Sequence, residues 1–513
     1  MSDFTFIGKE RTLFIGLMLV GAISLVVTYL WGDTGLDGHQ HTRFWSNLLH
    51  NCVFFTGIAF MAMFAMCAFI TAYAGWYVVM KRLWEAFSLF LVVGLGLMGL
   101  LGVANYLGLH HLYHWNMEGV LDPTHAEYDE LLVGKASFLN KNFYLFGTLI
   151  IVGIWTFFAF KVRGLSLAES DKGAKNDFSH HYKIRWWAAC FLPIAAFTSA
   201  AMIWQWVMSI DSHWYSTMFA WYSSASWFVA MLCLTILCLV YLKSRGYFQQ
   251  VTAEHFHDIG KFLFAFSIFW TYLWFSQYML IWYGNVGEET VYFHTRQNEY
   301  PVLFWGNLAI NFILPFFILM RNDTKRKYGT LIFVSVVVFL GHWWDYFYMI
   351  KPGVLETAQH ISHIHHGHGD GEHGHGSIYY GEGNALLIGY EDKGDEQGHD
   401  KHSHDKHSHD KHSHDKQGHE SHGHEAHGHD GEHHGAAHGG EHHDEAHGHE
   451  HGGHGHGEGE SPFYGFVIPG FLEIGTMLGF LGLFFWFVWG RLASAPLDPL
   501  NDPYAEESVN HHT

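Results

Sequence analysis

The chain has 513 residues, of which 49% are hydrophobic and 18% aromatic, and its formal net charge is −20. A single tract, roughly residues 351–461, carries −16 of this charge, with 22 Asp and Glu against 6 Lys. Because the remaining residues carry only −4, the composition excludes a general acidic scaffold, and no region is basic enough to bind nucleic acid.

Ten apolar runs follow one another along the chain, and each suits a membrane-spanning helix, which needs about 20 apolar residues. The first run follows Lys9 and Arg11. It is too long for the core of a signal peptide and lacks a small-residue cleavage site, so we expect it to be retained. The sequence therefore predicts an all-α integral membrane protein with ten transmembrane helices. They cover approximately residues 12–31, 48–72, 84–106, 143–160, 186–210, 215–242, 260–284, 302–320, 329–350 and 464–490.

These runs divide the chain into four parts. Residues 1–350 contain spans 1–9, residues 351–462 form a long polar loop, residues 463–490 contain span 10, and residues 491–513 form a tail. The two flanks and every second short loop hold 18 Lys and Arg, whereas the other short loops hold only Arg43, Lys135, Lys141 and Arg296. Cytoplasmic loops collect Lys and Arg, so both termini are predicted to be cytoplasmic in a bacterial inner membrane, with the polar loop periplasmic.

The polar loop contains 29 of the 45 His, and the unit HSHDK repeats in tandem within His399–Lys416. It has too few apolar residues to bury a core, so we expect it to be largely disordered. Imidazoles bind Zn²⁺, Ni²⁺ or Cu²⁺ in shifting sets, so metal bound there is expected to be adventitious. No fixed metal site is predicted in the chain.

All five Cys lie inside apolar runs, and no two of them form a CxxC pair. This pattern lacks a c-type haem attachment motif and any recognisable Fe–S or zinc set. We therefore expect no haem and no Fe–S cluster in this chain.

Several ionisable residues lie near the predicted outer ends of the spans, although such groups are costly at membrane depth. A carboxylate and an imidazole beside aromatic walls suit a quinol, whose hydroxyls need hydrogen-bond acceptors and whose oxidation releases two protons. Interfacial aromatic belts and helix caps are the structural alternative. The candidate catalytic residues are Asp211, His213, His50 and Asp345, and the candidate quinol-binding residues are Trp214, His342, Glu288 and His110.

On the opposite side, the stretch AEHFHDIGK (Ala253–Lys261) opens span 7 with Glu254, His257 and Asp258. These residues form either the mouth of a proton path or an ordinary charged helix start, which the helix dipole favours for the acids.

Three stretches carry a family resemblance: WQWVMSIDSHWYSTMFAWY (Trp204–Tyr222), HDIGKFLFAFSIFWTYLWFSQYMLIWYGNVGEET (His257–Thr290) and GHWWDYFYMIKPG (Gly341–Gly353). They resemble the polysulfide-reductase, NrfD-like membrane subunits of bacterial alternative complex III, a quinol:cytochrome c (or high-potential acceptor) oxidoreductase. That complex has two such subunits, of the ActC and ActF types, and this chain is more like the ActF type. The resemblance covers nearly all ten spans and implies two four-helix bundles, spans 2–5 and 6–9, with a peripheral helix at each end.

The resemblance also implies a role in quinol binding, proton translocation or both, with menaquinol or ubiquinol as the substrate and no cofactor in this chain. Its implied partners are membrane lipid, a paralogous NrfD-like subunit of the ActC type, a periplasmic Fe–S subunit, multihaem and monohaem cytochrome c subunits, and a terminal oxidase or cytochrome c. Asp211, His213 and Asp345 match positions in the family motifs, but Ser212 stands where the family usually has proline. The long His-rich loop is not a family feature.

Three other functions compete with this one. A divalent-metal transporter fits the His-rich loop, but no HExxH or HxxxD pair occurs in any span. A haem-bearing cytochrome b-type subunit would need axial His ligands deep in facing spans. A structural membrane anchor of the same complex, without its own quinol turnover, is the third.

Overall fold

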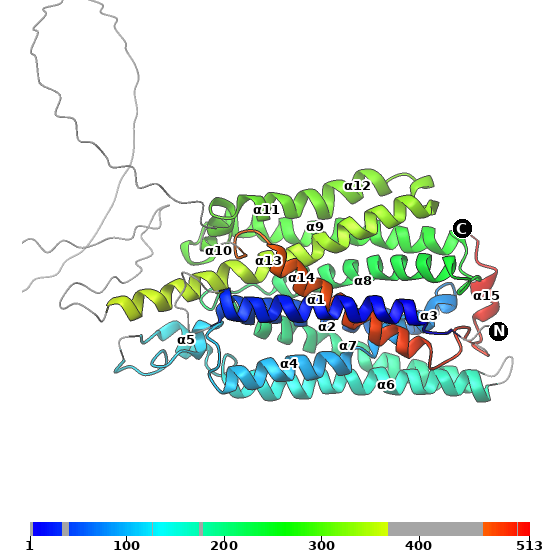
Figure 1. Cartoon of the computed structure of the whole chain (residues 1–513), viewed down its shortest axis with the longest axis horizontal. Coiled ribbons are helices and arrows are strands. Elements are labelled where there is room, and N and C mark those ends of the chain that lie inside the picture. Colours follow the sequence, from blue (N-terminus) through cyan, green and yellow to red (C-terminus); the bar gives the residue numbers. More distant parts are fainter. Residues whose placement is uncertain are drawn as a thin grey trace, which may run out of the picture. The chain divides into compact units, whose positions relative to one another are not determined.

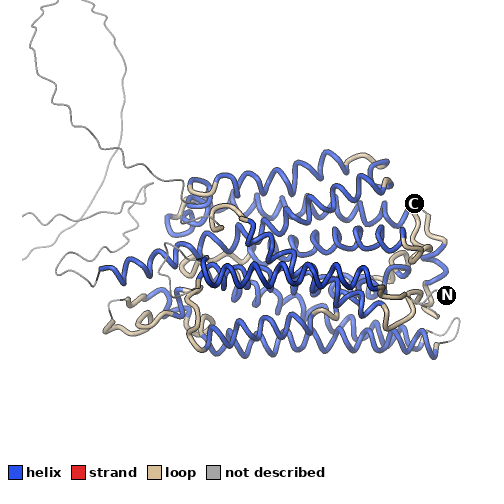
Figure 2. The backbone as a smooth tube through the Cα atoms, in the orientation of Figure 1, coloured by secondary structure: helices blue, strands red, loops and turns tan. Residues whose placement is uncertain are grey.

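The computed structural model describes residues 4–32, 41–125, 127–173, 178–367, 465–499 and 501–512. Within these ranges every regular element is a helix and no strand occurs (Figures 1 and 2). Ten helical segments are long and apolar enough to cross a membrane. The predicted all-α, ten-span class is confirmed, and the chain is a multi-pass membrane protein.

Spans 2–5 form the first four-helix bundle. Its helices contact one another in a closed ring, in the order α2, α4, α6, α7 and back to α2. A short 3-10 turn η1 (Val78–Met80) and the helix α3 precede α4 in span 3. The helices are α2 (Thr42–Thr71), α3 (Lys81–Ser88), α4 (Leu91–Tyr106), α6 (Thr148–Lys172) and α7 (Ser179–Trp206).

Spans 6–9 form the second bundle, in which α8 contacts α9 and α13, and span 8 packs between α9 and α13. Span 8 is divided by a turn of π-helix, η5. Helix α2 also contacts α8 and α13, so it joins the two bundles. The elements are α8 (Met218–Ser244), α9 (Ala253–Gly284), α11 (Pro301–Leu308), η5 (Ala309–Ile313), α12 (Leu314–Leu319) and α13 (Tyr328–Gly367).

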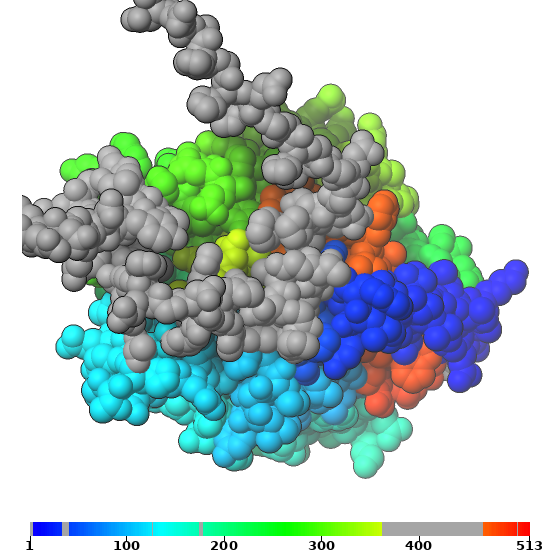
Figure 3. Space-filling model, turned by 60° about the vertical axis from the view of Figure 1, so that its left-hand side comes forward, coloured from blue at the N-terminus to red at the C-terminus, as the bar shows by residue number. Residues whose placement is uncertain are grey.

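The first and last spans, α1 (Gly8–Trp31) and α14 (Phe471–Leu492), pack along each other beside the bundles (Figures 1 and 3). Glycines allow this approach, because a Cβ atom built on Gly21 would overlap the Cα atom of Gly479. Small residues that let two backbones approach closely are typical of helix pairs in membranes. The predicted arrangement of two four-helix bundles with two peripheral helices is thus confirmed.

Gly21→Ala is expected to lower the thermal unfolding temperature of the purified protein, because the new methyl group meets the backbone of α14, which cannot rotate away. Overpacking of this kind costs about 1–3 kcal/mol. Gly16→Ala on the same helix is the matched control, since a Cβ atom there meets nothing within 4 Å. Equal unfolding temperatures for the two variants would contradict the close contact between α1 and α14.

Both described termini lie at one end of the helices. The ring of Phe4 contacts Tyr247, and His511 hydrogen-bonds to Asp258 near the start of α9. We call this the terminal end; it also contains η6 (Asp323–Arg326) and α15 (Ala505–Val509). The opposite, loop end contains α5 (Glu130–Lys135) and α10 (Gly287–Asn298) (Figure 1). It also contains the short elements η2 (His114–Asn116), η3 (Phe143–Gly147) and η4 (Met208–Ile210).

Helix α13 continues to Gly367, beyond the end predicted for span 9 near residue 350. The charge of Lys351 suggested a boundary, but its ammonium is buried and donates to Ser46 Oγ at 2.7 Å and Asn47 Oδ1 at 2.5 Å. Val354, Leu355, Ala358 and Ile361 then bury the next turns of the helix. The HSHDK repeats and most of the polar loop lie outside the described residues.

Candidate functional site

A carboxylate lies in the interior of the second bundle. The Asp345 side chain on α13 has no exposed surface. It accepts hydrogen bonds from Asn307 Nδ2 at 2.7 Å, from Trp270 Nε1 at 2.9 Å and from the hydroxyl of Tyr222. The donors belong to α11, α9 and α8, so each of the four spans supplies one member of this cluster.

Asp345 lies toward the loop end of the second bundle, although α13 itself continues past Lys351. Two of its donors lie close to the first residues of their helices at that end, Tyr222 in α8 and Asn307 in α11. Ionisable groups buried between membrane spans face the bundle interior and commonly mark proton or ion pathways. The cluster is therefore the strongest candidate site in the described part of the chain.

The polar cluster extends along span 8. Asn311 Nδ2 donates to Asn307 Oδ1 at 2.6 Å and to the carbonyl oxygen of Gly341 at 2.9 Å. Asn311 lies in the π-helical turn η5, and such single-turn insertions are frequent at functional sites. A Cβ atom on Gly341 would overlap Asn311 Oδ1, so a glycine is required for α13 to approach span 8 here.

Two of the predicted histidines, His342 and His50, lie near this cluster, but they contact different partners. His342 Nδ1 lies 2.9 Å from Ser226 Oγ and 4.0 Å from Asp345 Oδ2, and its buried Nε2 has no hydrogen-bond partner among the described residues. His50 on α2 instead bonds through Nε2 to the carbonyl oxygen of Trp343 at 2.9 Å and stacks on that indole. The structure thus brings His342 to Asp345, whereas His50 contacts the far side of α13.

At the loop end, Asp211 follows η4 and forms an ion pair with Arg296 on α10. The distance from Arg296 Nη2 to Asp211 Oδ2 is 2.8 Å, and the two side chains are 1% and 11% exposed, respectively. Burial of the guanidinium opposes its charge, but Asp211 holds the pKa of Arg296 above its usual value. Asp211 is therefore the counter-ion of Arg296, and its catalytic role stays a prediction.

Aromatic rings connect this ion pair to the buried carboxylate. The Arg296 guanidinium carbon lies 3.5 Å from the ring centroid of Tyr292, and that ring stacks on Trp214 at 3.9 Å. Phe219 then contacts both Tyr292 and Tyr222, the residue that donates to Asp345. The buried hydroxyls of Tyr292 and Tyr348 have no hydrogen-bond partner among the described residues. Buried polar atoms of this kind usually bind internal water.

The other residues predicted at this end are separated from Asp211. His213, two residues later, faces away from Arg296 and bonds to Asp129 Oδ2 at 2.5 Å. Glu288 is exposed at the start of α10. His110 packs against Trp45, and burial lowers the pKa of its imidazole to about 4. The structure therefore does not gather Asp211, His213 and His50 around one ligand.

At the terminal end, the predicted proton-path residues form ion pairs. Glu254 accepts from Arg326 at 2.8 Å. Asp258 accepts from Lys261 at 2.8 Å, lies 2.6 Å from His511 Nε2 and lies 3.7 Å from His257 Nδ1. These contacts fix the start of α9, and a proton path through these residues stays a prediction.

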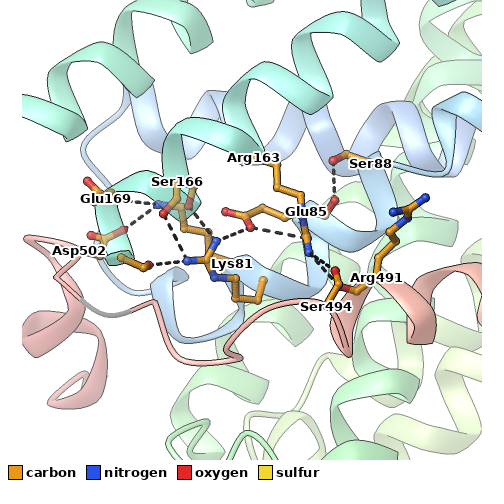
Figure 4. Close-up of polar contacts among 11 residues, drawn as sticks. Lys81, Glu85, Ser88, Arg163, Ser166, Glu169, Arg491, Ser494 and Asp502 are labelled. Atoms are coloured by element: carbon orange, nitrogen blue, oxygen red, sulfur yellow. Dashed lines mark hydrogen bonds and ion pairs between the residues drawn. The ribbon is translucent and has the colours of Figure 1, made fainter. Parts of the chain in front are cut away.

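A second buried charge cluster lies at the terminal end of the first bundle (Figure 4). Lys81 on α3 lies between two carboxylates, 2.8 Å from Asp502 and 3.3 Å from Glu169 on α6. Glu85 accepts from Arg82 at 2.7 Å and lies 3.8 Å from Arg163. Because Lys81 joins Asp502 of the C-terminal segment to Glu169 on α6, we interpret the cluster as a clamp that fastens this segment to the first bundle.

Several of these partners have only a weak signal in the sequence. Asn307 and Asn311 are spaced by four residues in an apolar span, and this polar pair is a signal that could have been used. Arg296 was recognised only as a loop cation, because its partner Asp211 is 85 residues away in the chain.

Comparison with protein-family models finds no match for this chain, and neither does comparison with curated proteins.

Proposed function

We propose that this chain is a membrane subunit of a respiratory quinol:cytochrome c (or high-potential acceptor) oxidoreductase, and that its second bundle transfers protons. The observation that supports this most strongly is the carboxylate of Asp345, buried among donors from three other spans. In the proposal, Asp345 exchanges protons with the loop end through water bound at Tyr292 and Tyr348, close to the Arg296–Asp211 pair.

Direct quinol binding by this chain has weaker support. A groove of about 250 Å³ lies at the loop end, lined in part by Trp204, Ser212, Trp214 and Tyr215. Ligand sites usually measure about 300–1,000 Å³, so the groove is small for a quinol ring with its tail. Proton transfer is therefore the better-supported contribution, with quinol oxidation at a paralogous subunit or at their interface.

The proposal places the chain in a bacterial inner membrane, with the terminal end cytoplasmic and the loop end periplasmic, as the Lys and Arg distribution predicts. Its partners would be a second subunit of the same family, a periplasmic Fe–S subunit and cytochrome c subunits, with a terminal oxidase or cytochrome c as electron acceptor.

Affinity purification of this chain from its native membrane tests the proposal. We expect c-type haem and Fe–S subunits to co-purify, and the preparation to reduce cytochrome c with added quinol. Isolation of the chain without any redox subunit, after mild solubilisation that keeps a known respiratory complex intact, would contradict the assignment. A redox complex that works normally when the proton site is altered would instead support a structural anchor.

A further inference from the structure

The loop end contains a cluster of metal-ligand side chains that the proposed function does not use. His114 lies in η2, Asp129 precedes α5, and His213 lies in the turn between α7 and α8. One ligand atom from each of the three lies within 4.8 Å of the others. From these observations we propose that His114, Asp129 and His213 bind one divalent transition metal ion of the zinc class.

The donor set selects the type of metal. Two imidazoles and one carboxylate suit Zn²⁺, whereas Mg²⁺ and Ca²⁺ prefer oxygen ligands.

The geometry requires a small movement for binding. His213 Nε2 and Asp129 Oδ2 are 2.5 Å apart, whereas two ligands of one tetrahedral zinc lie about 3.3 Å apart, given zinc–ligand bonds of about 2.0–2.1 Å. The His213 side chain is 40% exposed and has room for this shift.

A fourth ligand is available beside the three. The His360 ring lies 5.2 Å from that of His114, and its buried Nδ1 has no hydrogen-bond partner among the described residues. The ion would connect the segment between spans 3 and 4, the turn after span 5 and the end of α13. Lys135 adds a nearby positive charge, but its ammonium is bound to the carbonyl oxygens of Ser212 and His213.

The other metal-ligand cluster among the described residues makes a useful contrast. Glu169, His181 and Asp502 are equally close together, but the ammonium of Lys81 already lies 2.8 Å from Asp502 and 3.3 Å from Glu169. That cluster already contains a cation, whereas no Lys or Arg forms an ion pair with Asp129 among the described residues.

The test measures zinc per chain in the purified full-length protein after dialysis against chelators of increasing strength. The His-rich loop will bind zinc as well, so the comparison uses matched variants. We expect His114→Ala/Asp129→Asn to retain one zinc fewer than the unaltered chain. His125→Ala/Asp122→Asn is the control, because it makes the same changes in the same loop outside the cluster. Asparagine retains the ability of position 129 to cap α5.

Anomalous X-ray difference density at the zinc absorption edge then locates the ion, and we expect a peak among His114, Asp129 and His213. If the double variant fails to fold, the zinc measurement is repeated on His213→Ala, because that side chain is partly exposed and its removal disturbs the fold less. Equal zinc content in the cluster and control variants, or anomalous density without a peak at the three side chains, would overturn the proposal and assign all bound zinc to the His-rich loop.

Discussion

Asp345→Asn is expected to reduce quinol-driven proton release by about 100-fold, in line with the rate that a positioned acid–base group usually contributes. The amide cannot take up and release a proton. It also replaces one carboxylate oxygen with a donor, which faces groups that already donate, namely Asn307 Nδ2 and Trp270 Nε1. We therefore expect an additional loss of stability of about 1–3 kcal/mol.

The measurement is proton release and cytochrome c reduction by the complex in liposomes, with assembly checked by the haem spectrum. Asp323→Asn is the matched control, because the same chemical change occurs there on a side chain that is 63% exposed. Tyr222→Phe removes one donor but retains the carboxylate, so a much smaller loss is expected. Normal proton release by an assembled Asp345→Asn complex would exclude Asp345 from the path.

Separation of Asp211 from Arg296 is expected to destabilise the protein more strongly than any single change at the surface. Removal of one partner of a buried ion pair typically costs about 3–5 kcal/mol, because the other charge is left without compensation. Arg296 is 1% exposed and Asp211 is 11% exposed, so the stranded guanidinium is the more costly group. Asp211→Asn should therefore lower the unfolding temperature more than Arg296→Met.

A double-mutant cycle on the purified protein measures this coupling. Asp211→Asn/Arg296→Met should be more stable than the sum of the two single effects predicts, because no buried charge is left alone. The exposed pair Arg321–Asp323, at 74% and 63% exposure, is the control, and its coupling should stay below about 1 kcal/mol. Additive effects at Asp211 and Arg296 would show that the pair contributes no specific interaction.

The sequence predicted the membrane helices well, because long apolar runs leave few alternatives in a bilayer. It predicted their ends less well, since a charge such as Lys351 indicates a boundary unless its distant partners are known. The same limit applies to the sites. Asp345 and Asp211 could be identified as costly residues, but their different partners, Asn307 and Arg296, depend on which spans become neighbours.

Closeness in the sequence does not show which ionisable residues belong to the same site. Asp211 and His213 are two residues apart, yet the turn directs one toward α10 and the other toward the segment before α5. The sequence motif suggests one site that contains both residues, whereas in the fold they belong to two different clusters.

The pairing of α1 with α14 has a consequence for synthesis of the protein. The glycine surface around Gly21 packs against a partner that is encoded more than four hundred residues later, beyond the whole His-rich loop. During translation the first span must remain in lipid as an incomplete interface until the ribosome has passed Gly479. A chain that stops before α14 would leave this glycine surface facing lipid instead of its partner helix.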